Sequence, residues 1–269
     1  MINKQNLHTH TTFCDGRDTP AELIQEAMQR GFDSLGFSIH SYVSASPLKT
    51  MDRFEPYKTE IKRLKSEYEG RFDIFCGVEY DYYSSSSHEG YDYTLGAVHY
   101  LKTKNGIAGF DRKADYVKNF IEENFEGDGY KFAKCYYETL AELPRVANFD
   151  AIAHFDIVIK NNQILNFLDE DDPRYLSYAY EAADALKGKI PFFELNTGAI
   201  ARGYRNCPYP TVNILKKLKE NSFGVILGSD CHNKIYLDYA FEDAKALLSS
   251  VGFKSRFILT KTGYKEVEL

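Results

Sequence analysis

Residues 6–40, NLHTHTTFCDGRDTPAELIQEAMQRGFDSLGFSIH, contain one unit of the expected fold: a short strand, a polar loop, a helix and a second strand. The helix is well marked, because Thr19 is a suitable N-cap, Pro20 fits the first turn and Glu22 completes a capping box. Gly31 is expected to end it. Its apolar residues recur at helical spacing and should form the buried face: Leu23, Ile24, Ala27 and Met28. Such a unit predicts two parallel strands joined by a right-handed crossover.

The same alternation continues along the chain. After the opening strand, strands are expected at 33–39, 72–78, 92–98, 149–153, 190–195, 224–228 and 256–260. Further helices are expected at 55–70, 111–143, 173–187, 210–221 and 240–250. Seven or eight such units in 269 residues favour a closed α/β barrel over an open sheet. Because no Pro/Ser-rich linker and no repeat marks a boundary, we expect a single domain over residues 1–269.

Composition argues against several classes of protein. The chain is 43% hydrophobic and 27% charged, as globular proteins are, and no apolar run reaches the roughly 18 residues that span a bilayer. The N-terminus MINKQNLHTH lacks the apolar stretch of a signal peptide, and the five cysteines form no Cys-x-x-Cys pair. A net charge of −6 without a basic stripe argues against nucleic acid. We therefore expect a cytoplasmic protein with no membrane or nucleic-acid partner; the sequence leaves the oligomeric state open.

The histidines concentrate where the predicted strands end. His8 and His10 lie one residue apart, so in an extended segment both point to the same side, with Asp15 close behind. Of the seven histidines, only His88 lies away from a strand end. The candidate metal ligands are His8, His10, Asp15, His40, Glu79, His99, His154, Asp230 and His232. Because the C-terminal ends of parallel barrel strands converge on one mouth, these side chains should share a pocket.

Each of these residues also has an ordinary structural interpretation. His-x-His is a common string, a lone His40 or His99 is more often a hydrogen-bonded polar residue, and Asp230 alone could cap a helix. Together they favour a metal centre, because burying several imidazoles and three carboxylates in one pocket is costly unless they pair with cations. Nine ligands exceed the roughly four to six that one ion uses, so two or three divalent metals are expected, with Glu79 suited to bridging.

The segments HTH, SIH, GVEYD, GAVHY, IAHFD and GSDCH, in this order between residues 7 and 232, resemble the successive metal motifs of the polymerase and histidinol phosphatase (PHP) family. The resemblance implies a distorted TIM-like (β/α)7 barrel with a trinuclear centre at its C-terminal mouth, so the run 256–260 need not be a barrel strand. It also implies three ligand sets: His8, His10, Glu79 and Asp230; Glu79, His99 and His154; and Asp15, His40 and His232. Zinc, iron and manganese all occur in the family, and mixed His and carboxylate ligation permits each.

Such a centre is suited to phosphate ester hydrolysis, so the expected partner is a small phosphorylated metabolite. In the implied mechanism, a metal-bridging hydroxide attacks phosphorus in line while the metals clamp the phosphoryl oxygens. Asp230 would orient or deprotonate the water, and Asp15 or His232 would help to protonate the leaving alkoxide. Cys14 and Cys231 flank ligand positions but are expected only to fill gaps.

The segment ELNTGAIARGYRNCPYP (194–210) resembles the corresponding segment of histidinol-phosphate phosphatases. It contains Arg202 and Arg205, which are candidate phosphate ligands together with Arg17, because the guanidinium fork matches a phosphate. The tyrosine-rich loop at 80–93, with His88, could receive an imidazole and an ammonium group through its rings and acids: Tyr80, Tyr82, Tyr83, Tyr91, Asp81, Glu89 and Asp92.

The leading hypothesis is therefore a metal-dependent phosphatase that hydrolyses L-histidinol phosphate in histidine biosynthesis. One alternative is another PHP phosphoesterase that acts on nucleotides, phosphotyrosine or other small phosphates. Another, from a different class, is a non-catalytic metal-binding regulatory domain. Lost ligand positions would be its usual mark, and none of the nine is lost.

Overall fold

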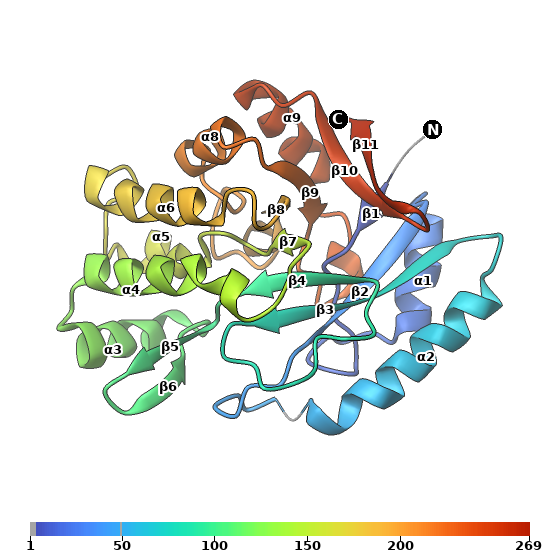
Figure 1. Cartoon of the computed structure of the whole chain (residues 1–269), viewed down its shortest axis with the longest axis horizontal. Coiled ribbons are helices and arrows are strands. Elements are labelled where there is room, and N and C mark those ends of the chain that lie inside the picture. The colour runs from blue at the N-terminus through green and yellow to red at the C-terminus, as the bar shows by residue number, and fades with distance from the viewer. Residues whose placement is uncertain (1–3, 49) are drawn as a thin grey trace.

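The computed structural model describes residues 4–48 and 50–269. Within these residues, seven parallel strands form one sheet in the order β1-β2-β3-β4-β7-β8-β9, as Figure 1 shows. Their bounds are β1 Gln5–Asn6, β2 Ser34–His40, β3 Asp73–Asp81, β4 Tyr93–Ala97, β7 Ala151–Ile152, β8 Phe192–Asn196 and β9 Gly224–Gly228. Apart from the inserted β5 and β6, the strands follow one another in the sheet in chain order, which is typical of an α/β barrel.

The sheet curves until its two edges almost meet. Thr9, just beyond β1, pairs with Cys231, just beyond β9, in an isolated parallel bridge. The backbone N of Cys231 donates to His8 O at 3.0 Å, and His10 N donates to Cys231 O at 2.8 Å. The predicted seven-stranded barrel is therefore confirmed, and the bridge that closes it lies at His8 and His10.

Helices cover the outside of the barrel (Figure 1). The longer helices are α1 Pro20–Gln29, α2 Phe54–Glu67, α3 Ala114–Phe125, α4 Gly129–Ala141, α6 Pro173–Leu186, α8 Val212–Glu220 and α9 Phe241–Val251. The short ones are α5 Asn162–Leu165 and α7 Gly198–Ala201, with 3-10 turns η1 Met51–Arg53, η2 Leu143–Arg145, η3 Ile157–Ile159 and η4 Lys234–Tyr236. The main hydrophobic core lies between these helices and the barrel.

Helix α1 begins as the sequence predicts. Thr19 Oγ1 accepts a hydrogen bond from Glu22 N, and the Glu22 carboxylate accepts one from Thr19 N, which completes the capping box. Leu23 and Ile24 are buried, but Met28, predicted to be buried, is 41% exposed. Met28 lies at the edge of the apolar stripe, where the helix face turns toward solvent.

Two segments in the middle of the chain differ from the prediction. A hairpin of β5 Tyr100–Thr103 and β6 Gly106–Gly109 follows β4, where no strand pair is predicted. The helix predicted at 111–143 is instead broken into α3 and α4, because Glu126 and Gly127 have left-handed φ values of 58° and 74°. Asp128 then caps α4 with its side chain.

The C-terminal strands β10 Ser255–Thr260 and β11 Gly263–Glu268 form an antiparallel hairpin outside the barrel sheet. The run 256–260 is thus not a barrel strand. The Gln5 side chain donates to Leu259 O and accepts from Leu259 N, each at 2.8 Å. Leu259 packs inside the barrel with Leu7, Phe75, Tyr93, Leu95, Ala97, Ala151, Ala153 and Ile226. Because Gln5 begins β1, the hairpin closes the N-terminal end of the barrel.

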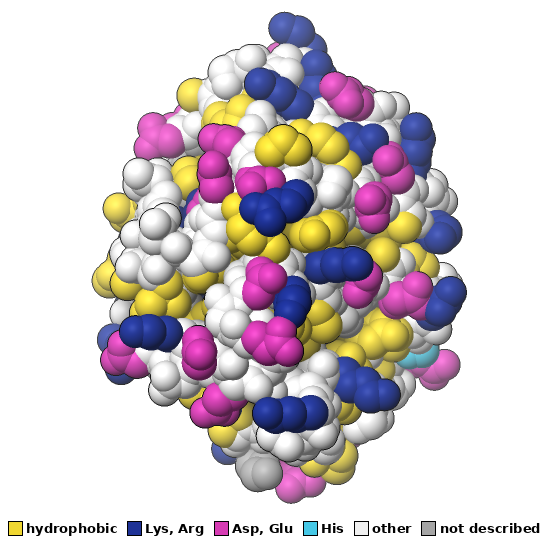
Figure 2. Space-filling view, turned by 90° about the vertical axis from the view of Figure 1, so that its left-hand side faces the viewer, with side chains coloured by type: hydrophobic (Ala, Val, Ile, Leu, Met, Phe, Trp, Pro, Cys, Tyr) yellow, Lys and Arg dark blue, Asp and Glu magenta, His cyan; other side chains and the backbone are white. Residues whose placement is uncertain are grey.

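The outer surface is mixed in charge. Figure 2 shows the side of the molecule on which α3, α4 and α6 lie, and there Lys and Arg side chains alternate with Asp and Glu. In the part of the chain that the structure describes, no helix is long and apolar enough to cross a membrane.

We predict that Leu259→Ala lowers the free energy of unfolding by about 2–5 kcal/mol, because it empties a buried site inside the barrel. Denaturant unfolding measures this change. Val212→Ala, at a position on α8 that is 41% exposed, is the control and should stay within about 0.5 kcal/mol of the parent chain. Equal effects of the two substitutions would show that the hairpin is not part of the core.

Candidate metal centre

The nine residues predicted as metal ligands all lie at the C-terminal mouth of the barrel. They come from six strand ends: His8, His10 and Asp15 after β1, His40 in β2, Glu79 in β3, His99 after β4, His154 after β7, and Asp230 and His232 after β9. Among the described residues, the ligand atoms form overlapping groups, each within 4.8 Å: His8, Glu79 and His154; His8, His10 and Asp230; and His10, Asp15, His40 and His232. The barrel thus brings together side chains that are far apart in the sequence.

Glu79 lies at the centre of these groups. Its side chain is 1% exposed, and its two oxygens face different imidazoles. Oε1 lies 2.7 Å from His154 Nε2 and 3.2 Å from His99 Nε2. Oε2 lies 2.9 Å from His40 Nδ1, 3.3 Å from His8 Nε2 and 3.4 Å from His10 Nε2. This division of the imidazoles suits a carboxylate that bridges two cations.

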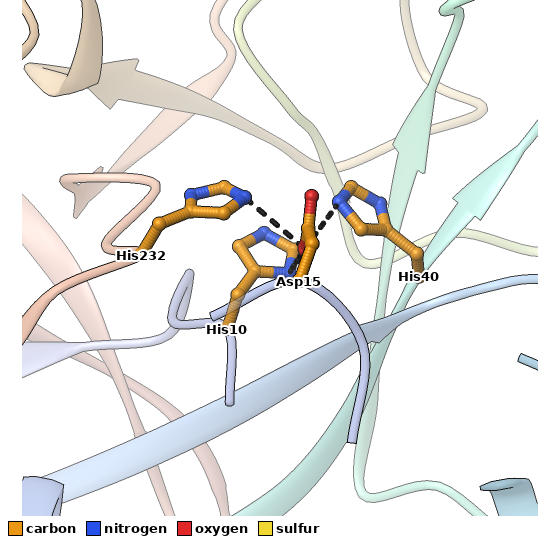
Figure 3. A group of neighbouring side chains, drawn as sticks. All are labelled: His10, Asp15, His40 and His232. Atoms are coloured by element: carbon orange, nitrogen blue, oxygen red, sulfur yellow. Dashed lines mark ion pairs between the residues drawn. The ribbon is translucent and has the colours of Figure 1, made fainter. Parts of the chain in front are cut away.

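The outermost group surrounds Asp15 (Figure 3). Asp15 Oδ1 lies 3.4 Å from His40 Nε2 and 3.3 Å from His232 Nε2. The His10 ring stacks against both of these imidazoles, with centroids 4.2 Å apart in each case. His10 also faces inward, with Nε2 at 3.1 Å from Asp230 Oδ1. It therefore stands between the outer group and the buried groups.

Several buried ligand atoms have no hydrogen-bond partner among the described residues: His8 Nε2, His10 Nε2 and Glu79 Oε2. Unpartnered buried polar atoms are costly, yet both imidazole atoms point at the same Glu79 oxygen. His99 Nε2 and His154 Nε2 also face each other at 3.3 Å. Divalent cations would satisfy all of these atoms, so the residues fit a metal centre with mixed His and carboxylate ligands.

The carboxylates attract positive charge to the mouth. Burial would lower the pKa of His40, but Asp15 and Glu79 outweigh burial and raise it well above its usual value. Burial is likewise outweighed at His99, where Glu79 above all raises the pKa to about 10. Burial would raise the pKa of Glu79, but His8 and its neighbours hold it well below its usual range. Cations would replace these protons, so metal binding should weaken as pH falls.

Glu194, in β8, is a site residue that the sequence analysis missed. Its buried carboxylate accepts hydrogen bonds from His8 Nδ1 at 2.9 Å and from His154 N at 3.0 Å. The bond at Nδ1 leaves the Nε2 lone pair of His8 facing Glu79, as metal ligation requires. Gly228 makes room for this contact, since a Cβ there would lie 1.7 Å from Glu194 Oε1. Its position near the end of the strand predicted at 190–195 could have identified it as a site residue.

Two of the predicted phosphate-binding arginines border the mouth. Arg202 donates to Asp230 Oδ2 at 2.6 Å and to Asp230 O at 2.7 Å, and its side chain is 25% exposed. Arg17 is exposed, and its backbone N donates to His232 O at 2.9 Å. Arg202 thus already holds one candidate metal ligand in place, and its side chain is partly exposed.

Arg205, the third arginine predicted to bind phosphate, is engaged by other groups in this structure. Its guanidinium is buried and donates to both oxygens of Glu170, at 2.8 and 2.6 Å, and to Ile159 O at 2.8 Å. Arg205 therefore pairs with a carboxylate of the α5–α6 connection, and its binding of phosphate stays a prediction.

Two residues of the tyrosine-rich loop, Asp92 and His88, contact other parts of the fold in this structure. Asp92 precedes β4 and so lies at the N-terminal end of that strand, where its carboxylate accepts from Cys76 N and Lys65 Nζ. His88 is exposed, with its ring edge against the Tyr80 ring. Neither arrangement brings the side chain to the ligands, because the loop returns to the opposite end of the barrel before β4 begins.

Of the acids predicted in that loop, Asp81 borders the metal centre. One of its oxygens accepts from His99 N at 2.7 Å and lies 3.3 Å from His99 Nδ1. The other accepts from Tyr83 N at 2.8 Å. Asp81 therefore orients His99, as Glu194 orients His8.

Neither cysteine beside the mouth belongs to the groups of candidate ligands. Cys14 Sγ lies 3.5 Å from His10 Nδ1, and Cys231 Sγ donates to Asn233 O at 3.0 Å. Burial raises the pKa of both thiols, that of Cys231 to about 12. The raised pKa of each thiol agrees with a gap-filling role.

A pocket of about 290 Å³ opens beside His40, Glu79 and His99. Its other walls are the loop after β2, from Ser41 to Leu48, and the segment that begins with the β5–β6 hairpin and ends at Arg112. An organic group attached to a phosphate at the metal centre would have room here.

The family model for the PHP domain matches residues 6–198. This chain belongs to the PHP domain family. A Bacillus subtilis PHP relative named "Histidinol-phosphatase" is 25% identical over 90% of this chain and 98% of its own length. A Deinococcus radiodurans protein named "Probable histidinol-phosphatase" is 28% identical over 94% of this chain and 95% of its own.

The PHP fold is also found in a solved structure of histidinol phosphate phosphatase from Lactococcus lactis, in complex with zinc, L-histidinol and phosphate. That structure matches with a TM-score of 0.69 at 16% identity, over 98% of this chain and 99% of its own. At this identity the likeness establishes the shared fold.

Glu194→Gln should weaken metal binding by this PHP domain roughly 10- to 100-fold, because a neutral amide orients His8 less firmly than a carboxylate does. Titration of the metal-free protein with Zn²⁺ or Mn²⁺ measures the change, after circular dichroism has shown that the variant is folded. Glu181→Gln, at an exposed position on α6, is the matched control. Equal affinities in the two variants would remove Glu194 from the site.

Proposed function

We propose that this PHP protein is a metal-dependent phosphomonoesterase that hydrolyses L-histidinol phosphate to L-histidinol and phosphate in histidine biosynthesis. The observation that carries the proposal is the convergence of nine His, Asp and Glu side chains on one mouth beside an open pocket. The names of two relatives that match nearly end to end support this substrate over nucleotides or phosphotyrosine.

The nine ligands would hold two or three divalent metals, with zinc, iron and manganese all compatible with the donor set. Glu79 would bridge, since its two oxygens already face different imidazoles. Bound there, the metals would lower the pKa of a water molecule and neutralise phosphoryl oxygens.

The protein's own residues supply orientation and proton transfer in the proposed reaction. Asp230 is buried, and two hydrogen bonds from Arg202 hold it at the mouth, so its carboxylate is placed to orient and deprotonate the attacking water. Arg202 adds a positive charge beside the phosphoryl group. Asp15 and His232, the more exposed ligands, are placed to pass a proton to the leaving alkoxide.

A cytoplasmic location is part of the proposal. All five cysteines belong to the described residues, and each is a free thiol, which agrees with a reducing compartment.

The direct test is phosphate release by purified protein loaded with Mn²⁺, Zn²⁺ or Fe²⁺. Histidinol phosphate should be hydrolysed with a higher kcat/KM than nucleoside monophosphates, phosphotyrosine or para-nitrophenyl phosphate. Activity should disappear when the metals are removed and return when they are restored.

Asp230→Asn, prepared in the same way, controls for contaminating phosphatases and should lose at least about 100-fold in turnover. If the protein prefers a nucleotide or phosphotyrosine, the histidinol phosphate assignment is wrong and the protein is another PHP phosphoesterase. A folded, metal-loaded protein that releases no phosphate from any ester would favour the regulatory domain.

A further inference from the structure

The pocket beside the metal centre contains a carboxylate that the proposed mechanism does not use. Asp111 follows the β5–β6 hairpin and lines the pocket together with His40, Glu79 and His99. The backbone N of Phe110 donates to His99 O at 3.0 Å, so the hairpin holds Asp111 next to a candidate metal ligand. Its side chain is 27% exposed.

The other carboxylates that line the pocket are already engaged. Asp15 faces three imidazoles, and Glu79 faces five. Both oxygens of Asp81 accept backbone hydrogen bonds, and its side chain is only 5% exposed. Asp111 differs, because Lys160 Nζ binds its Oδ1 at 2.6 Å while no hydrogen bond from the described residues reaches Oδ2.

Among the described residues, the cations around Asp111 leave this oxygen without a hydrogen bond: Lys160 binds the other oxygen, Arg202 donates to Asp230, and the adjacent Arg112 packs on a ring. Lys160 is nearly buried, and its Nζ lies over the Tyr204 ring at 4.5 Å, so its ion pair restrains one oxygen of Asp111. The Arg112 guanidinium packs on the Tyr116 ring at 4.9 Å. The carboxylate thus presents a fixed, negatively charged oxygen to the pocket.

Histidinol phosphate carries an ammonium group on the carbon next to the ester methylene. With its phosphate at the metal centre, that ammonium must lie close to the ligands, whereas its imidazole reaches farther out. The pocket is also suited to a flat ring, because Pro47, Leu48 and Tyr100 are among the residues that line it.

We propose that Asp111 binds the substrate's ammonium group and so selects phosphate esters that carry an amine beside the ester carbon. The inference rests on the proposed function and specifies which part of the chain recognises the amine. A charge-assisted hydrogen bond between an ammonium and a carboxylate is a strong and directional contact.

The test compares histidinol phosphate with imidazolylpropyl phosphate, which is the same molecule without its amino group. In the parent protein the ratio of the two kcat/KM values should favour histidinol phosphate. Asp111→Asn should lower this ratio roughly ten- to a hundredfold, since it removes one charged partner of the amine. Asp115→Asn, at an exposed position on α3, is the matched control and should leave the ratio unchanged.

Asp111→Glu provides a second variant, because it keeps a negative charge beside Lys160 and moves only the carboxylate. It should lower the ratio by less than Asp111→Asn does. If Asp111→Asn slows both substrates in parallel, the ratio does not change, Asp111 acts through the fold or the metal centre, and the inference is overturned. Failure of the proposed function would be visible in the parent protein alone, as the absence of histidinol phosphate hydrolysis, and would overturn both.

Discussion

A carboxylate buried among imidazoles sets the conditions for the rest of this molecule. Glu79 is almost completely buried, and side chains from several strands surround it. Its negative charge must therefore be matched by positive charge inside the barrel. Protons on His40 and His99 can supply that charge, and divalent cations can supply it better, because they also satisfy the unpartnered atoms of His8 and His10.

The barrel maintains this arrangement through contacts around the ligands. The bridge between Thr9 and Cys231 joins the two edges of the sheet beside His8 and His10. His154 and Asp230 both have positive φ values, 23° and 45°, a conformation that costs energy in residues other than glycine. Strain of this kind persists where the surrounding structure requires it, and here it turns two candidate ligands toward the same mouth.

The sequence predicted what depends on the strand period and on parallel topology. Ligands placed at strand ends, such as Glu79 and His154, could be assigned to one mouth because parallel strands all point the same way. It could not predict what depends on pairing between distant segments. The sequence does not reveal that Arg205 pairs with Glu170. It also does not reveal that Asp92, which directly precedes β4, lies at the end of the barrel opposite the mouth. Glu194 was missed because its contact with His8 joins segments far apart in the sequence, and Asp111 was missed because the hairpin that places it beside His99 was not predicted.

The most direct measurement is the metal content of the parent protein and of Glu79→Gln, determined on the same samples that are assayed for phosphate release. If Glu79 bridges, the parent protein should hold two or three transition metals per chain, and the variant should lose at least one of them together with most of its turnover. A folded Glu79→Gln protein with unchanged metal content and full activity would contradict the account, as would a parent protein that is active without bound metal.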